Sequence, residues 1–357
     1  ECRDSADYYS EHLEYDKALE WGEKALKLAE KELPESDTNY INILTTLSDI
    51  YIDSEKLDKA LEIARLDSSL KQKYGFTHTI NYAITLRNLA SVYGNNLLYA
   101  ESERLYLESK ELYGDLSATD HKSYAELLSN IGGLYLNIGE FDQAEANLKE
   151  AIKHRSKFGL KLDVANSLNN LAIVYTYSYR YILADSLIDE SIKIYKQFLK
   201  YDHPVFVNVR NTKAEICRVT GKYSQAEYLY EENIKIMEKK LPNHASSYAI
   251  YCNNLGKLKK TKFNFTEAEY YLKKAVEITE NQLNGKHEHY WKFLSTLAKF
   301  YLSADRYVES ESIIKKGLKF TKSIYSENNP VYIGFLYQLA AVYGAYKKNE
   351  EAESLYY

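Results

Sequence analysis

The feature that most constrains this chain is a repeat of about 42 residues that runs along its whole length. An anchor position, most often tyrosine, recurs every 42 residues in seven of eight intervals and after 40 residues in the other. The anchors are Tyr9, Tyr51, Tyr93, Tyr135, Tyr175, Cys217, Lys259, Tyr301 and Tyr343. A period of this length is typical of stacked units, none of which can bury its apolar face without its neighbours.

Two columns of small residues keep the same register as the anchor. Three residues before it stand Ala6, Ser48, Ala90, Gly132, Ala172, Ala214, Gly256, Ala298 and Ala340. Nine residues after it stand Ala18, Ala60, Ser102, Ala144, Ala184, Ala226, Ala268, Ser310 and Ala352. The distance between two packed helices depends on the side chains at their contact, so small residues let the backbones approach closely. Each repeat is therefore predicted to be a helix–turn–helix hairpin.

Composition supports an all-helical chain and excludes several classes of protein. The four prolines all lie between helical patterns, and 45% of the 357 residues are hydrophobic, which argues against disorder. No apolar run approaches the length of a membrane-spanning helix, and the net charge of -5 does not favour nucleic-acid binding. Three cysteines without a CxxC pair favour a reducing compartment, so we expect a cytoplasmic protein.

The order of the columns resembles the tetratricopeptide repeat. The segments GGLYLNIGEFDQAEANL (132–148) and AEICRVTGKYSQAEYLY (214–230) carry it best. The 42-residue period and the segments DHPV (202–205) and NNPV (328–331) resemble the long form found in kinesin light chains and many bacterial signalling proteins. The resemblance implies an all-α, right-handed superhelical solenoid of about nine hairpins. Its expected repeats are 1–39, 41–81, 83–123, 125–163, 165–205, 207–247, 249–289, 291–331 and 333–357.

The first and last repeats are truncated, which leads us to expect a natural chain that continues, at least at its C-terminus. Long arrays similar to this one precede the protease domain of bacterial caspase-like proteins of the CHAT class. One alternative is therefore that this chain is the regulatory or sensor arm of a larger bacterial enzyme. Another is a structural assembly protein that uses the outer face of the stack.

The sequence offers no catalytic or metal-binding motif, so we expect neither enzymatic activity in these residues nor a cofactor. The histidines His78, His121, His203, His244 and His287 recur at one place in the repeat, which indicates loop and helix-cap positions. A second histidine near the last of these, His289, is the weak candidate for a metal pair, without a carboxylate or cysteine set beside it. Cys217 and Cys252 fall on apolar faces and are expected to be buried and inert.

The first helices of such hairpins are expected to line the concave, ligand-binding surface. Five residues before the anchor, repeats two to nine carry only uncharged hydrogen-bonding side chains: Thr46, Asn88, Asn130, Asn170, Thr212, Asn254, Thr296 and Gln338. An asparagine amide both donates and accepts, so it can satisfy the backbone of an extended peptide. We predict peptide contact by Asn88, Asn130, Asn170 and Asn254, with stabilisation of the stack as the competing role. The adjacent variable column, with Thr45, Arg87, Ser129 and Asn169, is the predicted source of specificity.

A basic region is predicted on repeats six to eight. Arg218 and Lys260 follow their anchors directly, and Lys257 lies in KLKKTK (257–262), the densest basic run of the chain. Arg210, Lys213 and Lys222 are expected nearby. If Arg218, Lys257 and Lys260 face the groove, they would favour an acidic segment or a C-terminal carboxylate; a solvated helix face is the alternative. The leading hypothesis is a scaffold for a protein or extended peptide, acidic in part, within a larger complex and without membrane or nucleic acid as partner.

Overall fold

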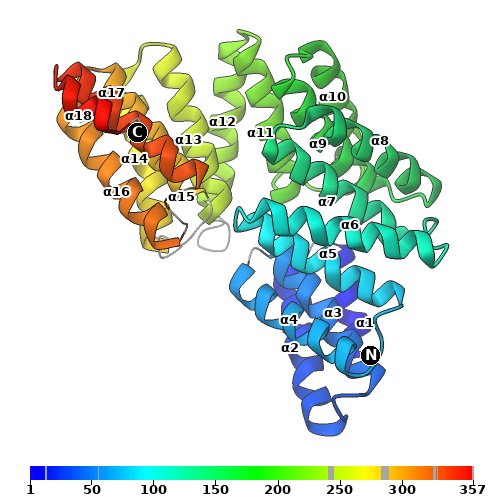
Figure 1. Cartoon of the computed structure of the whole chain (residues 1–357). Helices are drawn as coiled ribbons and strands as arrows, with labels where there is room; N and C mark the ends of the chain where they lie inside the picture. The colour runs from blue at the N-terminus through cyan, green and yellow to red at the C-terminus, as the bar shows by residue number, and fades with distance from the viewer. Residues whose placement is uncertain are drawn as a thin grey trace. The chain divides into compact units, whose positions relative to one another are not determined.

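The computed structural model describes residues 1–12, 14–54, 56–239, 245–282, 289–324, 327 and 329–355. Its regular structure in these residues is entirely α-helical, which confirms the predicted all-α repeat fold (Figure 1). The chain divides into two compact units, Glu1–Arg180 and Tyr181–Tyr357, which we describe separately as unit 1 and unit 2. No helix in the described residues has the length and apolar character needed to cross a membrane.

Helices alternate along the chain as first and second helices of successive hairpins. In unit 1 the helices are α1 (Cys2–Glu11), α2 (Tyr15–Glu32), α3 (Thr38–Asp53), α4 (Leu57–Lys73), α5 (Ile80–Asn95), α6 (Tyr99–Asp115), α7 (Lys122–Ile138), α8 (Phe141–Lys157) and α9 (Lys161–Tyr177). In unit 2 they are α10 (Tyr181–Phe198), α11 (Pro204–Val219), α12 (Tyr223–Glu238), α13 (Ala245–Thr261), α14 (Phe265–Gln282), α15 (Tyr290–Ser303), α16 (Tyr307–Ile324), α17 (Pro330–Ala345) and α18 (Asn349–Ser354). Odd-numbered helices carry the anchors, and each even-numbered helix begins six residues after an anchor.

In the seven hairpins whose turn is described at this point, the residue four positions after the anchor is left-handed. Glycine supplies it at Gly139 and Gly221, where φ is +87° and +79°. Elsewhere a side chain accepts this conformation: Leu97, Tyr179, Phe263, Asp305 and Lys347 have φ between 56° and 61°. The left-handed region disfavours bulky residues. The repeated geometry of the turn therefore overrides local preference at these positions.

The small columns are the contact points between the two helices of one hairpin, as predicted. Ser102 Oγ on α6 donates a hydrogen bond of 2.7 Å to the Ala90 carbonyl on α5, and Ser310 Oγ makes the same bond to Ala298 at 2.9 Å. A Cβ atom added at Gly132 would lie 2.7 Å from Leu148 Cγ. Backbones this close leave room only for glycine, alanine or serine.

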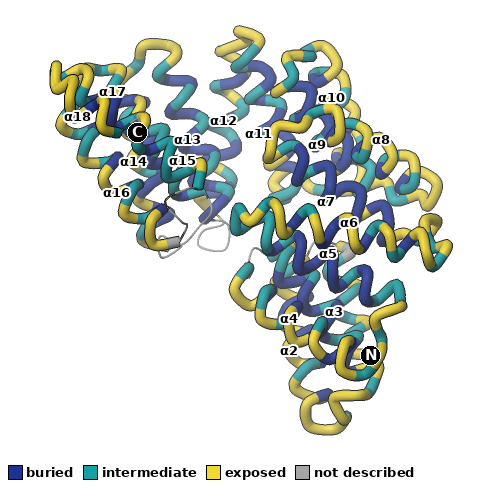
Figure 2. The backbone as a smooth tube through the Cα atoms, viewed as in Figure 1, coloured by how far each residue is buried: buried dark blue, intermediate teal, exposed yellow. Residues whose placement is uncertain are grey.

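The first helices form one layer of each unit. In unit 1, α3 contacts α5 and α5 contacts α7; in unit 2, α11 contacts α13 and α13 contacts α15. Second helices of neighbouring hairpins make no such contacts within the described residues of either unit. First helices are thus packed side by side, while second helices are spread apart, so each unit presents its first helices as an inner surface. Burial is greatest where hairpins face one another, and the turns are exposed (Figure 2).

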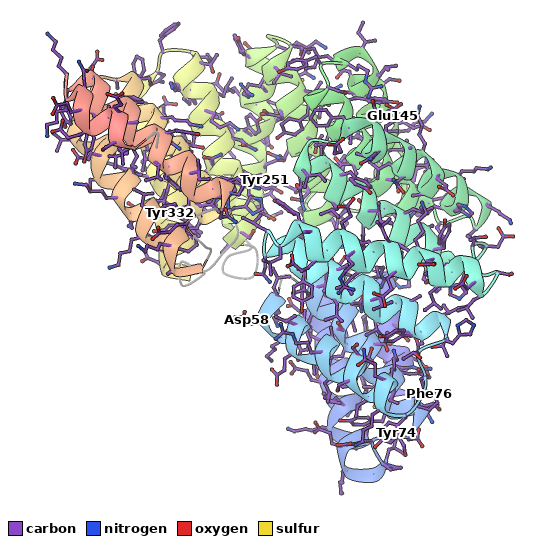
Figure 3. All side chains as sticks on the ribbon, in the orientation of Figure 1. Asp58, Tyr74, Phe76, Glu145, Tyr251 and Tyr332 are labelled. Carbon is purple, nitrogen blue, oxygen red and sulfur yellow. The ribbon has the colours of Figure 1, made fainter. Side chains whose placement is uncertain are left out.

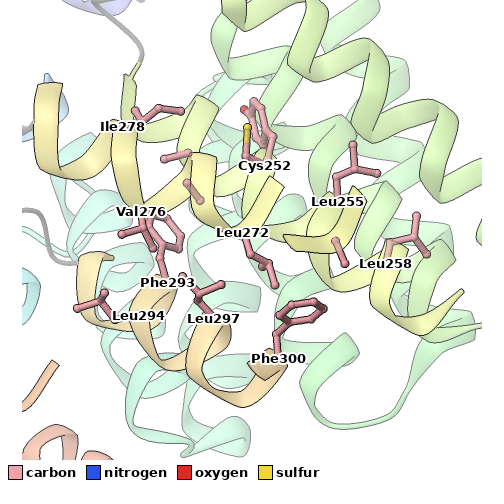
Figure 4. Close-up of a cluster of buried hydrophobic side chains, with 14 of the residues drawn as sticks. Cys252, Leu255, Leu258, Leu272, Val276, Ile278, Phe293, Leu294, Leu297 and Phe300 are labelled. Carbon is pink, nitrogen blue, oxygen red and sulfur yellow. The ribbon is translucent and has the colours of Figure 1, made fainter. Parts of the chain in front are cut away.

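The core of unit 2 is a continuous apolar layer between hairpins. Figure 4 shows side chains of α13, α14 and α15 meeting in it, among them Leu255, Leu272 and Leu297. Cys252 belongs to this cluster and Cys217 is fully buried as well. Burial raises the pKa of the Cys252 thiol to about 12 and also raises that of Cys217. Both thiols are therefore buried and unreactive, as the sequence predicted.

Three anchor tyrosines, Tyr135, Tyr175 and Tyr301, join their hairpin to the preceding one through a hydrogen bond that sequence reasoning missed. The hydroxyl of Tyr175 donates to Glu145 Oε1 at 2.8 Å, and the carboxylate belongs to α8 of the hairpin before (Figure 3). The same bond joins Tyr135 to Glu103 at 3.0 Å and Tyr301 to Glu269 at 3.0 Å. The available signal was a column of acids ten residues after the anchor: Glu103, Glu145, Asp185, Glu227, Glu269 and Glu311.

Candidate functional site

Two of the four predicted asparagines are used inside the stack. Asn88 is only 1% exposed, and its Oδ1 accepts hydrogen bonds from Nε and Nη2 of Arg87 at 3.2 and 3.1 Å. Asn254 Nδ2 donates to Asn211 Oδ1 at 3.2 Å and so links α13 to α11. These two amides hold neighbouring side chains and helices, which is the competing role that the sequence left open.

The other two asparagines keep most of their hydrogen-bonding capacity. Asn130 on α7 and Asn170 on α9 are half-buried, and their two helices are in contact. Asn170 Oδ1 accepts one bond of 3.3 Å from Asn169, while Asn130 makes no side-chain hydrogen bond within the described residues. Two adjacent amides on the inner surface of unit 1 can therefore donate to, and accept from, a bound chain.

Unit 1 also carries an acidic face, by which we mean Asp49, Asp53 and Glu126. Arg87, which is buried, reaches from α5 to Asp49 on α3 and to Glu126 on α7 and so pairs with two of the three acids. Desolvation by the surrounding protein, followed by the charges of Asp49 and Glu126, raises the pKa of Asp53 to about 7. Desolvation likewise raises the pKa of Asp49 to about 6 against the opposing effect of Arg87. The sequence analysis missed this face, although acids at Asp49 and Asp53 flank one anchor.

The predicted basic residue Arg218 lies in unit 2 and has its own counter-ion. Its Nε and Nη2 donate to the two oxygens of Glu215 at 2.9 and 2.6 Å, a bidentate pair. Glu215 also accepts a bond of 2.8 Å from the hydroxyl of Tyr230. The hydrogen bond and charge of Glu215 raise the pKa of Arg218, so the guanidinium is held in place and its charge is balanced.

The lysine face of unit 2, defined as Lys257, Lys260 and Lys299, has fewer acids. Lys257 Nζ donates to Asn254 Oδ1 at 3.3 Å, and burial lowers its pKa although Glu215 lies near. Burial and the charge of Lys299 lower the pKa of Lys260. A lowered lysine pKa means that the charged form is poorly compensated, which a bound anion would correct. This face can thus attract carboxylates.

Most of the other predicted basic residues, both in the run 257–262 and near it, pair with acids of the preceding hairpin. Lys259 and Lys262 both bond to Glu227 on α12, each at 2.5 Å. Lys213 and Lys222 bond to Asp185 at 2.7 and 3.2 Å. Contrary to the expectation from the sequence, these residues do not extend the lysine face, because the acid column of the preceding hairpin neutralises them. Arg210 is buried and does not reach that face either.

The prediction that the variable column sets specificity is wrong for two repeats. Thr45 Oγ1 donates to Asp67 Oδ2 on α4 at 3.0 Å, and Ser129 Oγ accepts from Arg155 on α8 at 3.2 Å. Both side chains face the second helix of their own hairpin and are buried there. The column lies nearer the hairpin interior than its sequence variation suggested.

The histidine positions that can be described lie in loops or at helix caps. His78 lies in the loop directly before Thr79, the N-cap of α5. His121 and His203 are the N-cap residues of α7 and α11, and His121 Nδ1 accepts from the Ser123 amide at 3.3 Å. His289 is the N-cap of α15. His244 and His287 lie outside the described residues. Within the part of the chain that is described, no group of three or more His, Cys, Asp or Glu is arranged to hold a metal ion.

Comparison with known proteins places the fold. A family profile described as tetratricopeptide repeat matches residues 81–157 and 163–239, and a second profile with the same description matches 249–289. Together these matches cover more than half of the chain. No curated protein sequence matches it.

Several solved structures are similar to this chain at low sequence identity. NprR in complex with its cognate peptide NprX has a TM-score of 0.67 and 16% identity, with 99% of this chain and 95% of that chain covered. A Rap protein complexed with Competence and Sporulation Factor has a TM-score of 0.61 and 13% identity, with coverage of 88% and 95%. BtubC (BKLC) from P. vanneervenii has a TM-score of 0.51 and 17% identity, with coverage of 60% and 87%. Likeness at this level of identity concerns the fold.

Proposed function

Because the chain belongs to the tetratricopeptide-repeat family, we propose that it is a scaffold that binds peptides or extended protein segments on its first helices, with no catalytic step in these residues. Two proteins of similar fold support this proposal by their own ligands, since NprR was solved with the peptide NprX and a Rap protein with Competence and Sporulation Factor. Shape and hydrogen bonding supply the affinity, and no covalent chemistry is involved.

The observation that carries the proposal is the pair of amides at Asn130 and Asn170. They lie on adjacent first helices and are half-exposed, and most of their donors and acceptors are not used by the protein. An extended chain offers alternating N–H and C=O groups, which such amides satisfy together. Recognition of this kind depends on the backbone and makes little demand on the ligand's sequence.

The first test replaces both amides. Asn130→Ala with Asn170→Ala is expected to weaken binding of a short Gln-rich peptide by about thirtyfold, since the two amides each lose a hydrogen bond worth about 1 kcal/mol. Binding is measured by fluorescence anisotropy and stability by thermal unfolding. The melting temperature should fall by no more than about 2–4 °C. The matched control is Asn254→Ala, which removes a bond between helices and should reduce stability without reducing this binding. If binding and stability fall together in the double variant, the amides are structural.

We further propose that the lysine face takes an acidic segment. Lys257, Lys260 and Lys299 are three positive charges on α13 and α15, two of which have a lowered pKa. The nearby pair Arg218–Glu215 is internally balanced, so it positions the surface and adds little net attraction. A carboxylate bound here would pair with poorly compensated ammonium groups.

Charge reversal tests this second proposal. Lys257→Glu with Lys260→Glu should abolish binding of a Glu-rich peptide and leave a Gln-rich peptide of the same length unaffected. Matched charge reversal at Lys213, which faces Asp185 and Asp189, should change neither. Equal losses for the two peptides would show that the lysines act through the fold and not through charge.

A further inference from the structure

Arg210 on α11 breaks a rule that the rest of the chain keeps. It stands seven residues before the anchor, on the side of the helix that packs into the hairpin. The equivalent residues are Leu44, Leu86, Leu128, Leu168, Cys252, Leu294 and Leu336. Arg210 is only 4% exposed, so a guanidinium occupies a place that hydrocarbon fills elsewhere. A departure from a repeat's own packing rule is the kind of local conflict that proteins keep at functional sites.

No acceptor in the described residues compensates this cation. Its Nε, Nη1 and Nη2 atoms are all buried, and none of them has a hydrogen-bond partner. The guanidinium carbon lies 3.8 Å from the centre of the Tyr201 ring and 5.3 Å from that of Phe206. Aromatic faces attract a cation, but they do not satisfy its N–H donors. Arginine cannot escape by losing its proton, so an unpaired buried charge remains.

The carboxylate of Glu232, whose charge acts on Arg210, is bonded to another residue. Burial lowers the pKa of Arg210, and Tyr201, Tyr251 and Glu232 oppose this only in part. Glu232 on α12 instead bonds to Lys235 Nζ, at 3.2 Å. Beside it lies a cavity of about 310 Å³ that is lined by Asp202, Glu232, Lys235, Ile236 and Lys239. The cavity thus touches the loop that carries Tyr201 and the helix that carries Glu232.

We propose that Arg210 is the anchor of an oxyanion-binding site, which takes a carboxylate or phosphate group that enters from this cavity. The guanidinium offers a planar pair of donors that matches either group. The cavity lining carries Lys235 and Lys239 together with Asp202 and Glu232, and Lys235 is already bonded to Glu232, so Lys239 is the lysine left to attract an anion. Arg210 lies behind the half-exposed ring of Tyr201, which has to move aside before the anion can reach the guanidinium. This site lies about 200° around α11 from the asparagine column, because the two positions are two residues apart. It is therefore separate from the surface of the proposed peptide scaffold.

The test compares the full chain with its Arg210→Leu variant, which restores the residue found at six of the equivalent positions. Thermal unfolding is followed in inorganic phosphate, in acetate and in chloride at matched ionic strength. In the wild type, phosphate or acetate should raise the melting temperature by about 2–4 °C more than chloride does. In Arg210→Leu this anion-specific increase should disappear. A response to acetate alone identifies the ligand group as a carboxylate, and a response to phosphate alone identifies it as a phosphate.

Two further variants keep the result interpretable. Arg210→Lys retains the charge but loses the paired donors, so it should lose most of the response, and it serves if Arg210→Leu does not fold. Lys257→Glu with Lys260→Glu should keep the full response, which separates this site from the lysine face. A wild type that responds to phosphate and acetate no more than to chloride would overturn the proposal. So would an Arg210→Leu variant that responds as the wild type does.

Discussion

The two units differ in charge at an equivalent position of the repeat. Two residues before the anchor, the charged residues of unit 1 are the acids Asp7 and Asp49, whereas unit 2 has Glu215 in one repeat and Lys257 and Lys299 in the next two. In unit 1 the acidic face is partly neutralised by Arg87, and in unit 2 the lysine face keeps most of its charge. Packing is alike in both, since the small columns and turns are the same. The comparison teaches that the fold tolerates either sign of charge at this position.

The units also differ in what they bury between hairpins. Twenty residues after the anchor, unit 1 has Lys71, Tyr113 and Arg155, and unit 2 has Tyr195, Met237, Thr279 and Thr321. Lys71 Nζ bonds to Asp67 Oδ2 at 3.0 Å and to the hydroxyls of Thr45 and Thr85 at 2.7 Å each. Both members of this ion pair are 1% exposed. Unit 1 thus relies on buried charge where unit 2 relies on apolar and hydroxyl side chains.

The largest expected effect follows from that ion pair. Asp67→Ala leaves Lys71 charged and buried without a counter-ion, which should reduce the free energy of unfolding by about 3–5 kcal/mol. Denaturant unfolding followed by circular dichroism measures it. The control is Asp67→Leu with Lys71→Met, in which methionine matches Met237 of unit 2; it should stay close to the wild type because no charge is left buried. If the double variant is as unstable as Asp67→Ala, the stability at this site depends on how the side chains fill the space and not on their charges.

A smaller effect is expected at the acidic face. The pKa of Asp53 is about 7 in the folded chain against an ordinary value of 3.8, so the folded state holds more protons between these values. Stability should therefore fall as pH rises through this range. The Asp53 side chain still contacts solvent although protein surrounds its carboxylate, so solvent screening limits the effect to about 0.5–1 kcal/mol. Asp53→Asn should remove this part of the slope and melt higher than the wild type at about pH 8. A variant with an unchanged slope would contradict the raised pKa.

The smallest effect concerns the lysine face. Lys299→Ala removes the like charge that helps to lower the pKa of Lys260, so that pKa should rise. Nuclear magnetic resonance titration of the lysine side chains measures the change. The same variant should weaken binding of a Glu-rich peptide by about twofold, since one screened surface charge is lost. Asp53→Asn, on the other unit, should leave this binding as it is. A Lys260 pKa that does not move would mean that burial alone lowers it.

The sequence sufficed for the fold because the repeat encodes it many times over. The anchor, the small columns and the start of each second helix were all readable, since close backbone contact permits only a few residue types. The site was less accessible. Asn88 and Asn254 look like Asn130 and Asn170 in sequence, and only their neighbours Arg87 and Asn211 decide which amides are already engaged. Ion pairs such as Lys213–Asp185 join residues of different hairpins, which one column cannot reveal.

Several expectations from the sequence stay predictions. The comparisons give no support to an arm of a CHAT-class protease, and neither they nor the structure bear on an assembly role for the outer face. The division of the whole chain into nine repeats within a single domain also stays a prediction. These questions concern what the chain is joined to, whereas the structure describes how each hairpin meets the next.

The bonds that Tyr135, Tyr175 and Tyr301 make to a glutamate of the preceding hairpin have a mechanical consequence. They lie where consecutive hairpins meet, so they act as tethers across a hinge. A ligand that draws the first helices together would make neighbouring hairpins rotate relative to each other about these hydrogen bonds. Each unit would then become more curved. The energy of this change is divided among the interfaces between hairpins, so each interface takes a smaller part when more hairpins take part. The resistance of each unit to this change in curvature would then depend on the tyrosine hydroxyls, although the ligand does not touch them.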